Sequence, residues 1–170
     1  MASGSSNNPG FGMMMVAALG CLALLTWFFA GVVDERANPN RQVHSQIVNG
    51  GIEVVLEADR QGHFVATGQI NGRDVRFLVD TGATLVSVPE SLADRLGLER
   101  EAPIRLETAA GTVQGWLTRL DEVRLGDIVQ RDVRAAINPG RHESVLLGMS
   151  FLRELEMTQR RGELRLVTDG

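Results

Sequence analysis

The feature that constrains this chain most is an apolar segment that runs directly into an aspartate. Phe77–Val79 is apolar, Asp80 follows it, and Thr81 and Gly82 lead into a second strand-like stretch, 84–88. Apolar runs separated by turn residues predict two buried strands joined by a tight turn. A carboxylate at a buried turn is costly unless its oxygens accept hydrogen bonds. We therefore expect backbone N–H groups to fold back on Asp80, with Gly82 providing backbone freedom.

An Asp-Thr-Gly triplet also has an ordinary explanation, because aspartate often closes its own turn through its side chain. Three observations favour a more specific role. Apolar runs lie on both sides of the triplet, Ala83 and Thr84 follow it, and a second apolar run, 145–148, ends in glycine. The triplet is therefore treated as the centre of a candidate site.

The sequence pattern of residues 51–170 predicts many short strands separated by turn signals. Asn71-Gly72 is a strong hairpin signal. Two short helices are expected, at 89–97, between a proline and a glycine, and at 149–157. This pattern predicts an all-β fold, a small closed or nearly closed β-barrel. The expected strands are 52–57, 63–70, 75–79, 84–88, 104–108, 113–118, 120–125, 128–137, 144–148 and 163–167.

The N-terminal part has a different composition. Residues 1–10 are rich in Ser, Asn and Gly and are expected to be disordered. Residues 11–33 contain no charged side chain, and about 20 apolar residues suffice to cross a bilayer as a helix. Aromatic residues 27–29 lie near the end of this run, where an aromatic belt would be. A cleaved signal peptide is the competing interpretation, but the run is long and no basic residue precedes it. We expect an uncleaved single-pass transmembrane helix.

Residues 34–50 are polar, contain Asn-Pro-Asn, and are predicted to be a linker. Arg36 and Arg41 follow the expected span and no Lys or Arg precedes it. By the positive-inside rule this would place the C-terminal domain in the cytoplasm, although long domains can translocate regardless of charge.

Composition excludes several classes of function. The formal net charge of −4 gives no basic footprint, so nucleic acid is not an expected partner. The single cysteine, Cys21, lies in the apolar run, so the remainder of the chain contains no disulfide. The three histidines lie far apart and no paired-cysteine spacing exists, so neither a metal nor another cofactor is expected.

Three features stand in order along the chain: Asp80-Thr81-Gly82-Ala83, a glycine-bearing hairpin at 109–115, and the run 145–148. Together they resemble the retropepsin-like aspartic proteases, the half-size relatives of pepsin. More narrowly, the chain is similar to the membrane-anchored, single-domain aspartyl proteases of Gram-negative bacteria. Ala110 departs from the asparagine expected in these relatives, which bears on the hairpin turn. The segments that carry this resemblance are 62–64, 70–72, 77–84, 108–111 and 146–152.

The resemblance implies roles for particular residues. Asp80 would be the catalytic carboxylate of an endopeptidase. Thr81 would brace two such turns across a symmetry axis, and Gly82 would supply a backbone N–H to Asp80. Further residues would support the turn (Ala83, Thr84), pack beneath it (Leu146, Leu147, Gly148), or form a flap that closes over a peptide (Thr108, Ala109, Ala110, Gly111, Thr112).

The resemblance also implies an assembly and a location. Peptide hydrolysis by this route needs two carboxylates sharing one proton around a water. The chain has one Asp-Thr-Gly, so the second carboxylate would come from a second copy in a C2 homodimer. The domain 51–170 would face the periplasm from the bacterial inner membrane, and we follow this over the arginine count. The alternative is a catalytically silent module of the same fold that dimerises or binds peptide.

Overall fold

The computed structural model describes Leu19, Leu22 and residues 38–108, 111–140 and 142–169. The chain divides into two compact units, 1–36 and 37–170. The expected disorder of 1–10 and nearly all of the expected span 11–33 lie outside the described residues. Among the residues that are described, no helix has the length and apolar character needed to cross a membrane. The transmembrane helix therefore stays a prediction.

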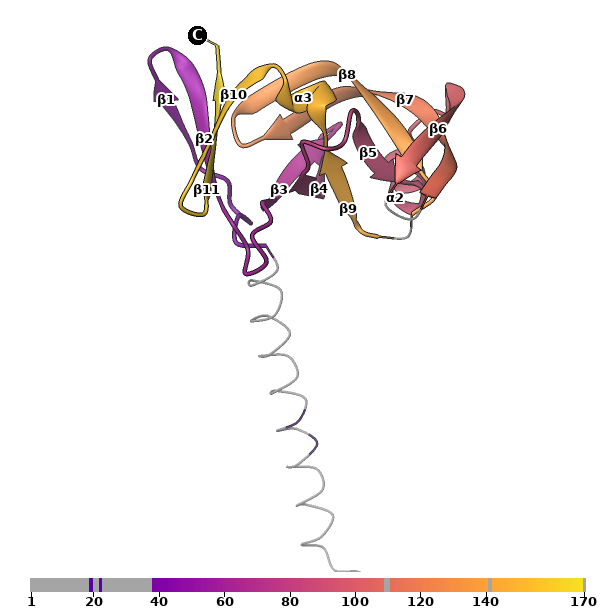
Figure 1. The fold of residues 1–170 in the computed structure, drawn as a ribbon, viewed down its shortest axis with the longest axis horizontal. Helices are drawn as coiled ribbons and strands as arrows, with labels where there is room; N and C mark the ends of the chain where they lie inside the picture. Colours follow the sequence, from indigo (N-terminus) through magenta and orange to yellow (C-terminus); the bar gives the residue numbers. More distant parts are fainter. Residues whose placement is uncertain (1–18, 20–21, 23–37, 109–110, 141, 170) are drawn as a thin grey trace, which may run out of the picture. The chain divides into compact units, whose positions relative to one another are not determined.

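The larger of two sheets closes on itself as a barrel (Figure 1). Its strand order is β3-β4-β9-β5-β8-β7-β6, and β3 also pairs with β7 through Gln69 with Arg124 and Ile70 with Val123. Six strands thus form a closed ring, with β6 attached outside it to β7, which confirms the predicted closed barrel. The strands are β3 (Val65–Ile70), β4 (Arg73–Val79), β5 (Val86–Pro89), β6 (Ala102–Thr108), β7 (Gly111–Leu125), β8 (Ile128–Asn138) and β9 (Ser144–Leu147).

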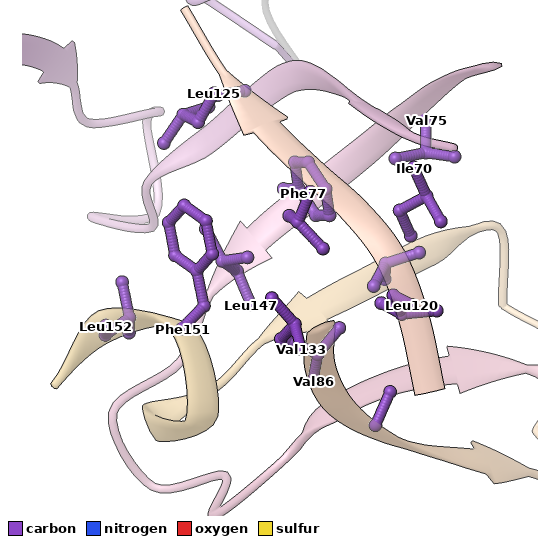
Figure 2. Close-up of a cluster of buried hydrophobic side chains, with 14 of the residues drawn as sticks. Ile70, Val75, Phe77, Val86, Leu120, Leu125, Val133, Leu147, Phe151 and Leu152 are labelled. Carbon is purple, nitrogen blue, oxygen red and sulfur yellow. The ribbon is translucent and has the colours of Figure 1, made fainter. Parts of the chain in front are cut away.

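The barrel interior is filled by side chains that alternate along the strands, as a period of two requires. Val75 and Phe77 of β4 point inward and meet Leu120, Leu147 and other residues of the core cluster (Figure 2). Gly68 is required where β3 lies against β7. A Cβ there would lie 2.4 Å from the Arg124 carbonyl oxygen and 2.6 Å from the Phe77 ring.

A second, four-stranded antiparallel sheet has the order β1-β2-β11-β10. Its strands are β1 (Ser45–Val48), β2 (Gly51–Glu57), β10 (Leu155–Arg160) and β11 (Glu163–Thr168). Val54 and Leu56 of β2 and Leu164 and Leu166 of β11 join the same core cluster as the barrel residues. The two sheets therefore share one hydrophobic core.

One of the two helices agrees with the sequence prediction and the other is shorter. Helix α2 (Glu90–Leu96) lies between Pro89 and Gly97, which has the left-handed φ of 70°. Helix α3 (Met149–Leu152) was expected to continue to 157, but β10 begins at Leu155. Leu155 is buried, Glu156 is exposed and Met157 packs against the core, a period-two pattern too short to detect in the sequence.

The segment expected to be a linker, 34–50, belongs in part to the folded unit. Its described residues include β1 and two buried asparagines, Asn38 and Asn40. Asn40 forms a parallel bridge with Ala66 of β3. We call residues 38–48 the N-terminal strap. Its polar composition resembles that of a linker because many of its contacts are hydrogen bonds, although Val43 also packs against the core.

Candidate active site

Asp80 lies directly after β4, in a position determined by the strands on either side. β4 pairs with β3 on one side and with β9, in parallel, on the other. The Val79 amide donates to the Phe64 carbonyl oxygen at 2.9 Å, and the Asp80 amide donates to the Leu147 carbonyl oxygen at 3.2 Å. The backbone at Asp80 is thus held from two directions, and the residue is half-buried.

The turn after β4 folds back on the Asp80 side chain, as expected from the cost of leaving a carboxylate without hydrogen bonds. The Gly82 amide donates to Asp80 Oδ1 at 2.9 Å. The Ala83 amide donates to the Asp80 carbonyl oxygen at 3.2 Å and closes the turn. Thr81, Gly82 and Thr84 are exposed. We call residues 80–84 the Asp80 turn.

The Leu146–Gly148 run packs against this turn. Leu147 is fully buried and belongs to the core cluster, where Figure 2 shows it near Phe151. Gly148 approaches the turn so closely that a Cβ would lie 2.6 Å from the Ala83 carbonyl oxygen and 2.3 Å from that of Leu85. Only glycine fits this site without a shift of the backbone. Segments more than 60 residues apart in sequence, Asp80–Thr84 and Leu146–Gly148, therefore meet in the structure.

The start of α3 adds support that the sequence analysis did not assign. The Met149 amide donates to the Ala83 carbonyl oxygen at 2.8 Å, and the Ser150 amide donates to that of Thr84 at 3.0 Å. Ser150 Oγ also accepts a hydrogen bond from the Val86 amide at 2.8 Å. Ser150 thus bonds the chain on both sides of Leu85. The only sequence signal was its place in the Leu-Leu-Gly-Met-Ser run.

The expected flap is a hairpin of β6 and β7, and residues 109 and 110 at its tip lie outside the described residues. Thr108 Oγ1 donates to the Gly111 carbonyl oxygen at 2.7 Å. Thr112 Oγ1 lies 2.9 and 3.0 Å from the two carboxylate oxygens of Glu107. Gly111 has φ of 112°, a conformation that favours glycine. The hairpin exists as predicted, and its closure over a ligand stays a prediction.

The fold and the site define a class: a small closed β-barrel that presents an aspartate on a rigid turn, as in aspartic proteases built from a single half-size domain. The model of the family described as gag-polyprotein putative aspartyl protease matches residues 66–154. The match runs from the second residue of β3 through α3 and therefore includes the Asp80 turn, the expected flap and the Leu146–Gly148 run. The chain belongs to this retropepsin-like family.

Two similar proteins give the extent of the likeness. The uncharacterized protein in the cobV 5' region of Sinorhizobium sp is 38% identical over 122 residues, which cover 69% of this chain and 52% of that protein. The chain thus spans about half the length of this curated relative. The crystal structure of a retropepsin-like aspartic protease from Rickettsia conorii matches with a TM-score of 0.60 and 21% identity, covering 75% of this chain and 94% of that one. At this identity the likeness concerns the fold.

Proposed function

We propose that this protein is an aspartic endopeptidase, a hydrolase of peptide bonds whose catalytic carboxylate is that of Asp80. The observation that carries the proposal is the hydrogen bond that the Gly82 backbone N–H donates to Asp80 Oδ1, on a turn that lies against Gly148. A carboxylate held in one orientation is suited to act on a water, since catalysis depends on a fixed geometry of the reacting groups. Family membership supports the same chemistry.

The second carboxylate comes from a second copy of the chain. Aspartic proteases use two aspartates that share one proton, because two close like charges cannot both ionise easily. The sequence contains one Asp-Thr-Gly. We therefore propose a C2 homodimer in which Asp80 of each copy lies at the axis. The exposed Thr81 of each copy is free to bond across that axis.

The reaction would follow from this pair. The ionised Asp80 takes a proton from the water while the water oxygen attacks the peptide carbonyl carbon. The protonated Asp80 of the other copy donates to the carbonyl oxygen. The first Asp80 then gives the proton that it took from the water to the amide nitrogen, while the other Asp80 takes a proton back from a hydroxyl of the tetrahedral intermediate. The C–N bond breaks, the carboxyl group and the amine leave, and the pair again holds one proton. The β6–β7 hairpin closes over the extended peptide and excludes water.

The location is also a proposal. The charge-free run 11–33 anchors the protein in the bacterial inner membrane as a single span, with the protease domain in the periplasm. An alkaline phosphatase fusion at residue 170 tests this, because that enzyme is active only after export. Activity of a cytoplasm-dependent reporter at the same position, with an inactive phosphatase fusion, would place the domain in the cytoplasm.

The decisive experiment is Asp80→Asn in the full-length protein, which keeps the shape and removes the charge. We expect casein cleavage to fall by roughly 10²–10⁴-fold, the range for loss of a general acid–base group. Asp121→Asn, at an exposed carboxylate of β7, is the matched control and should retain activity. Unchanged cleavage in Asp80→Asn would reject the protease and favour the alternative, a silent module that binds peptide or dimerises.

A further inference from the structure

Asn40 fixes the entry of the chain into the protease domain. It is 6% exposed. Its Nδ2 donates to the Val65 carbonyl oxygen at 2.7 Å and to that of Glu57 at 2.9 Å. Its Oδ1 accepts from the Glu57 amide at 2.8 Å, and its carbonyl oxygen accepts from the Thr67 amide at 3.0 Å. Detaching Asn40 would leave several buried or partly buried polar groups without partners, which is costly.

Asn38 and the rest of the N-terminal strap are held as well. Asn38 is 7% exposed, and its Nδ2 donates to Thr67 Oγ1 at 2.9 Å. Its Oδ1 accepts from the Asn40 amide at 3.2 Å. Farther along, Ser45 Oγ accepts from the Asp127 amide at 2.8 Å in the β7–β8 turn, and β1 pairs with β2. Because the strap is bonded to the domain from Asn38 onward, it adds no free length to the connection between the domain and the apolar run.

The sequence leaves very little chain between this fixed point and the apolar run. That run ends at Val33, and four residues precede Asn38. Even fully extended, the chain from Val33 to Asn38 spans at most about 18 Å. A compact domain of this size has a radius of gyration of roughly 14 Å, hence a diameter on the order of 35 Å. The connection is thus about half as long as the domain it carries.

We propose that the N-terminal strap holds the protease domain against the membrane surface and so restricts its substrates to peptide segments close to that surface. The inference rests on the proposed protease function and the predicted span. The substrate class is the extended juxtamembrane segment of another membrane protein, which can bind as a strand beside the Asp80 turn. Segments displayed far above the membrane lie beyond the reach of Asp80, whatever their sequence. Confinement to a surface raises the effective concentration of segments within reach.

The test uses the full-length enzyme in liposomes with two single-span reporters. Both carry one cleavable peptide, identified beforehand from digests of a soluble protein. In the near reporter the peptide adjoins the span, and in the far reporter a helical Glu-Ala-Ala-Ala-Lys stalk of about 60 residues raises it by roughly 90 Å. The enzyme variant carries about 80 Gly/Ser residues inserted between Glu35 and Arg36, which add roughly 50 Å of root-mean-square reach. The matched control carries the same insertion between Ser6 and Asn7, before the apolar run.

We expect the wild type and the control to cut the near reporter at least about tenfold faster than the far one, with the insertion after Glu35 bringing the two rates together. Cleavage of the free peptide should be equal in all three enzymes. If the free peptide is cut but the wild type cuts both reporters equally, or the Glu35 insertion leaves its preference unchanged, the inference is wrong and the protease remains. If no enzyme cuts the free peptide, the proposed function fails, and the inference fails with it.

Discussion

At the scale of single residues, two glycines of the site have different tasks. Gly148 has no room for a Cβ, because three backbone atoms of residues 83 and 85 would lie within 2.3–2.7 Å of it. A Cβ at Gly82 would meet only Asp80 Oδ1, at 3.1 Å, which is a side-chain atom that can move. Gly148 thus maintains the packing of the turn, and Gly82 leaves room for the Asp80 carboxylate in its observed position.

This difference predicts that stability and activity separate. Gly148→Ala should lower the free energy of unfolding by about 1–3 kcal/mol, the usual cost of overpacking, and reduce activity as well. Gly82→Ala should leave thermal stability nearly unchanged and reduce peptide cleavage, because it displaces the carboxylate. Thermal denaturation and casein cleavage of both variants provide the measurements. Equal losses of stability in the two variants would contradict this assignment.

Part of the site could be predicted from the sequence because its signals are local. Asp80 and Gly82 lie two residues apart, so the bond between them could be expected from turn chemistry alone. Ser150 could not be assigned, because its partner, the Val86 amide, is 64 residues away. No periodicity or turn signal at Ser150 indicates that contact.

At the scale of elements, the N-terminal strap is the segment whose structure differs most from the prediction made from its composition. Asn-Pro-Asn in a polar stretch has linker composition. Yet the Asn40 side chain replaces a strand partner for the end of β2 and the start of β3. Such a role depends on which backbone groups lack partners in the folded state, and that information is not in the segment itself.

We therefore predict that Asn40→Ala lowers the free energy of unfolding by about 2–3 kcal/mol, because the Glu57 and Val65 backbone groups lose their partner in a buried site. Urea denaturation followed by circular dichroism measures the change. Gln42→Ala, at an exposed position of the same segment, is the control and should cost under about 0.5 kcal/mol. A similar small effect in both variants would show that the strap is dispensable.

A second prediction about an element concerns the expected flap, the β6–β7 hairpin. If the β6–β7 hairpin closes over a peptide, a transition-state-like peptide inhibitor should slow amide hydrogen exchange at 104–115. The hairpin of β10 and β11 is the internal control, and its exchange should not change. Exchange measured by mass spectrometry with and without inhibitor decides between closure and an ordinary exposed hairpin. Unaltered exchange at 104–115, with inhibitor demonstrably bound, would exclude a flap.

At the scale of the whole molecule, the proposed chemistry requires two copies. Equal coexpression of wild-type and Asp80→Asn chains should leave about one quarter of the wild-type specific activity, because only dimers of two wild-type chains carry both carboxylates. Chains that act alone would leave one half. The ratio of the two chains is checked by intact mass, and sedimentation in detergent reports the dimer. An active, strictly monomeric enzyme would overturn the proposal.

The local features of this protein could be predicted from its amino-acid sequence: most strands of period two, helix α2 between its proline and glycine, and a turn that folds back on its own aspartate. These follow from interactions between residues near one another in the chain. Only the folded chain shows how distant segments meet: β3 closes on β7, Gly148 lies against the Asp80 turn, and Asn40 forms hydrogen bonds with the end of β2 and the start of β3. Each of these contacts depends on steric fit or on backbone groups that lack a strand partner, and both conditions arise only when the chain folds.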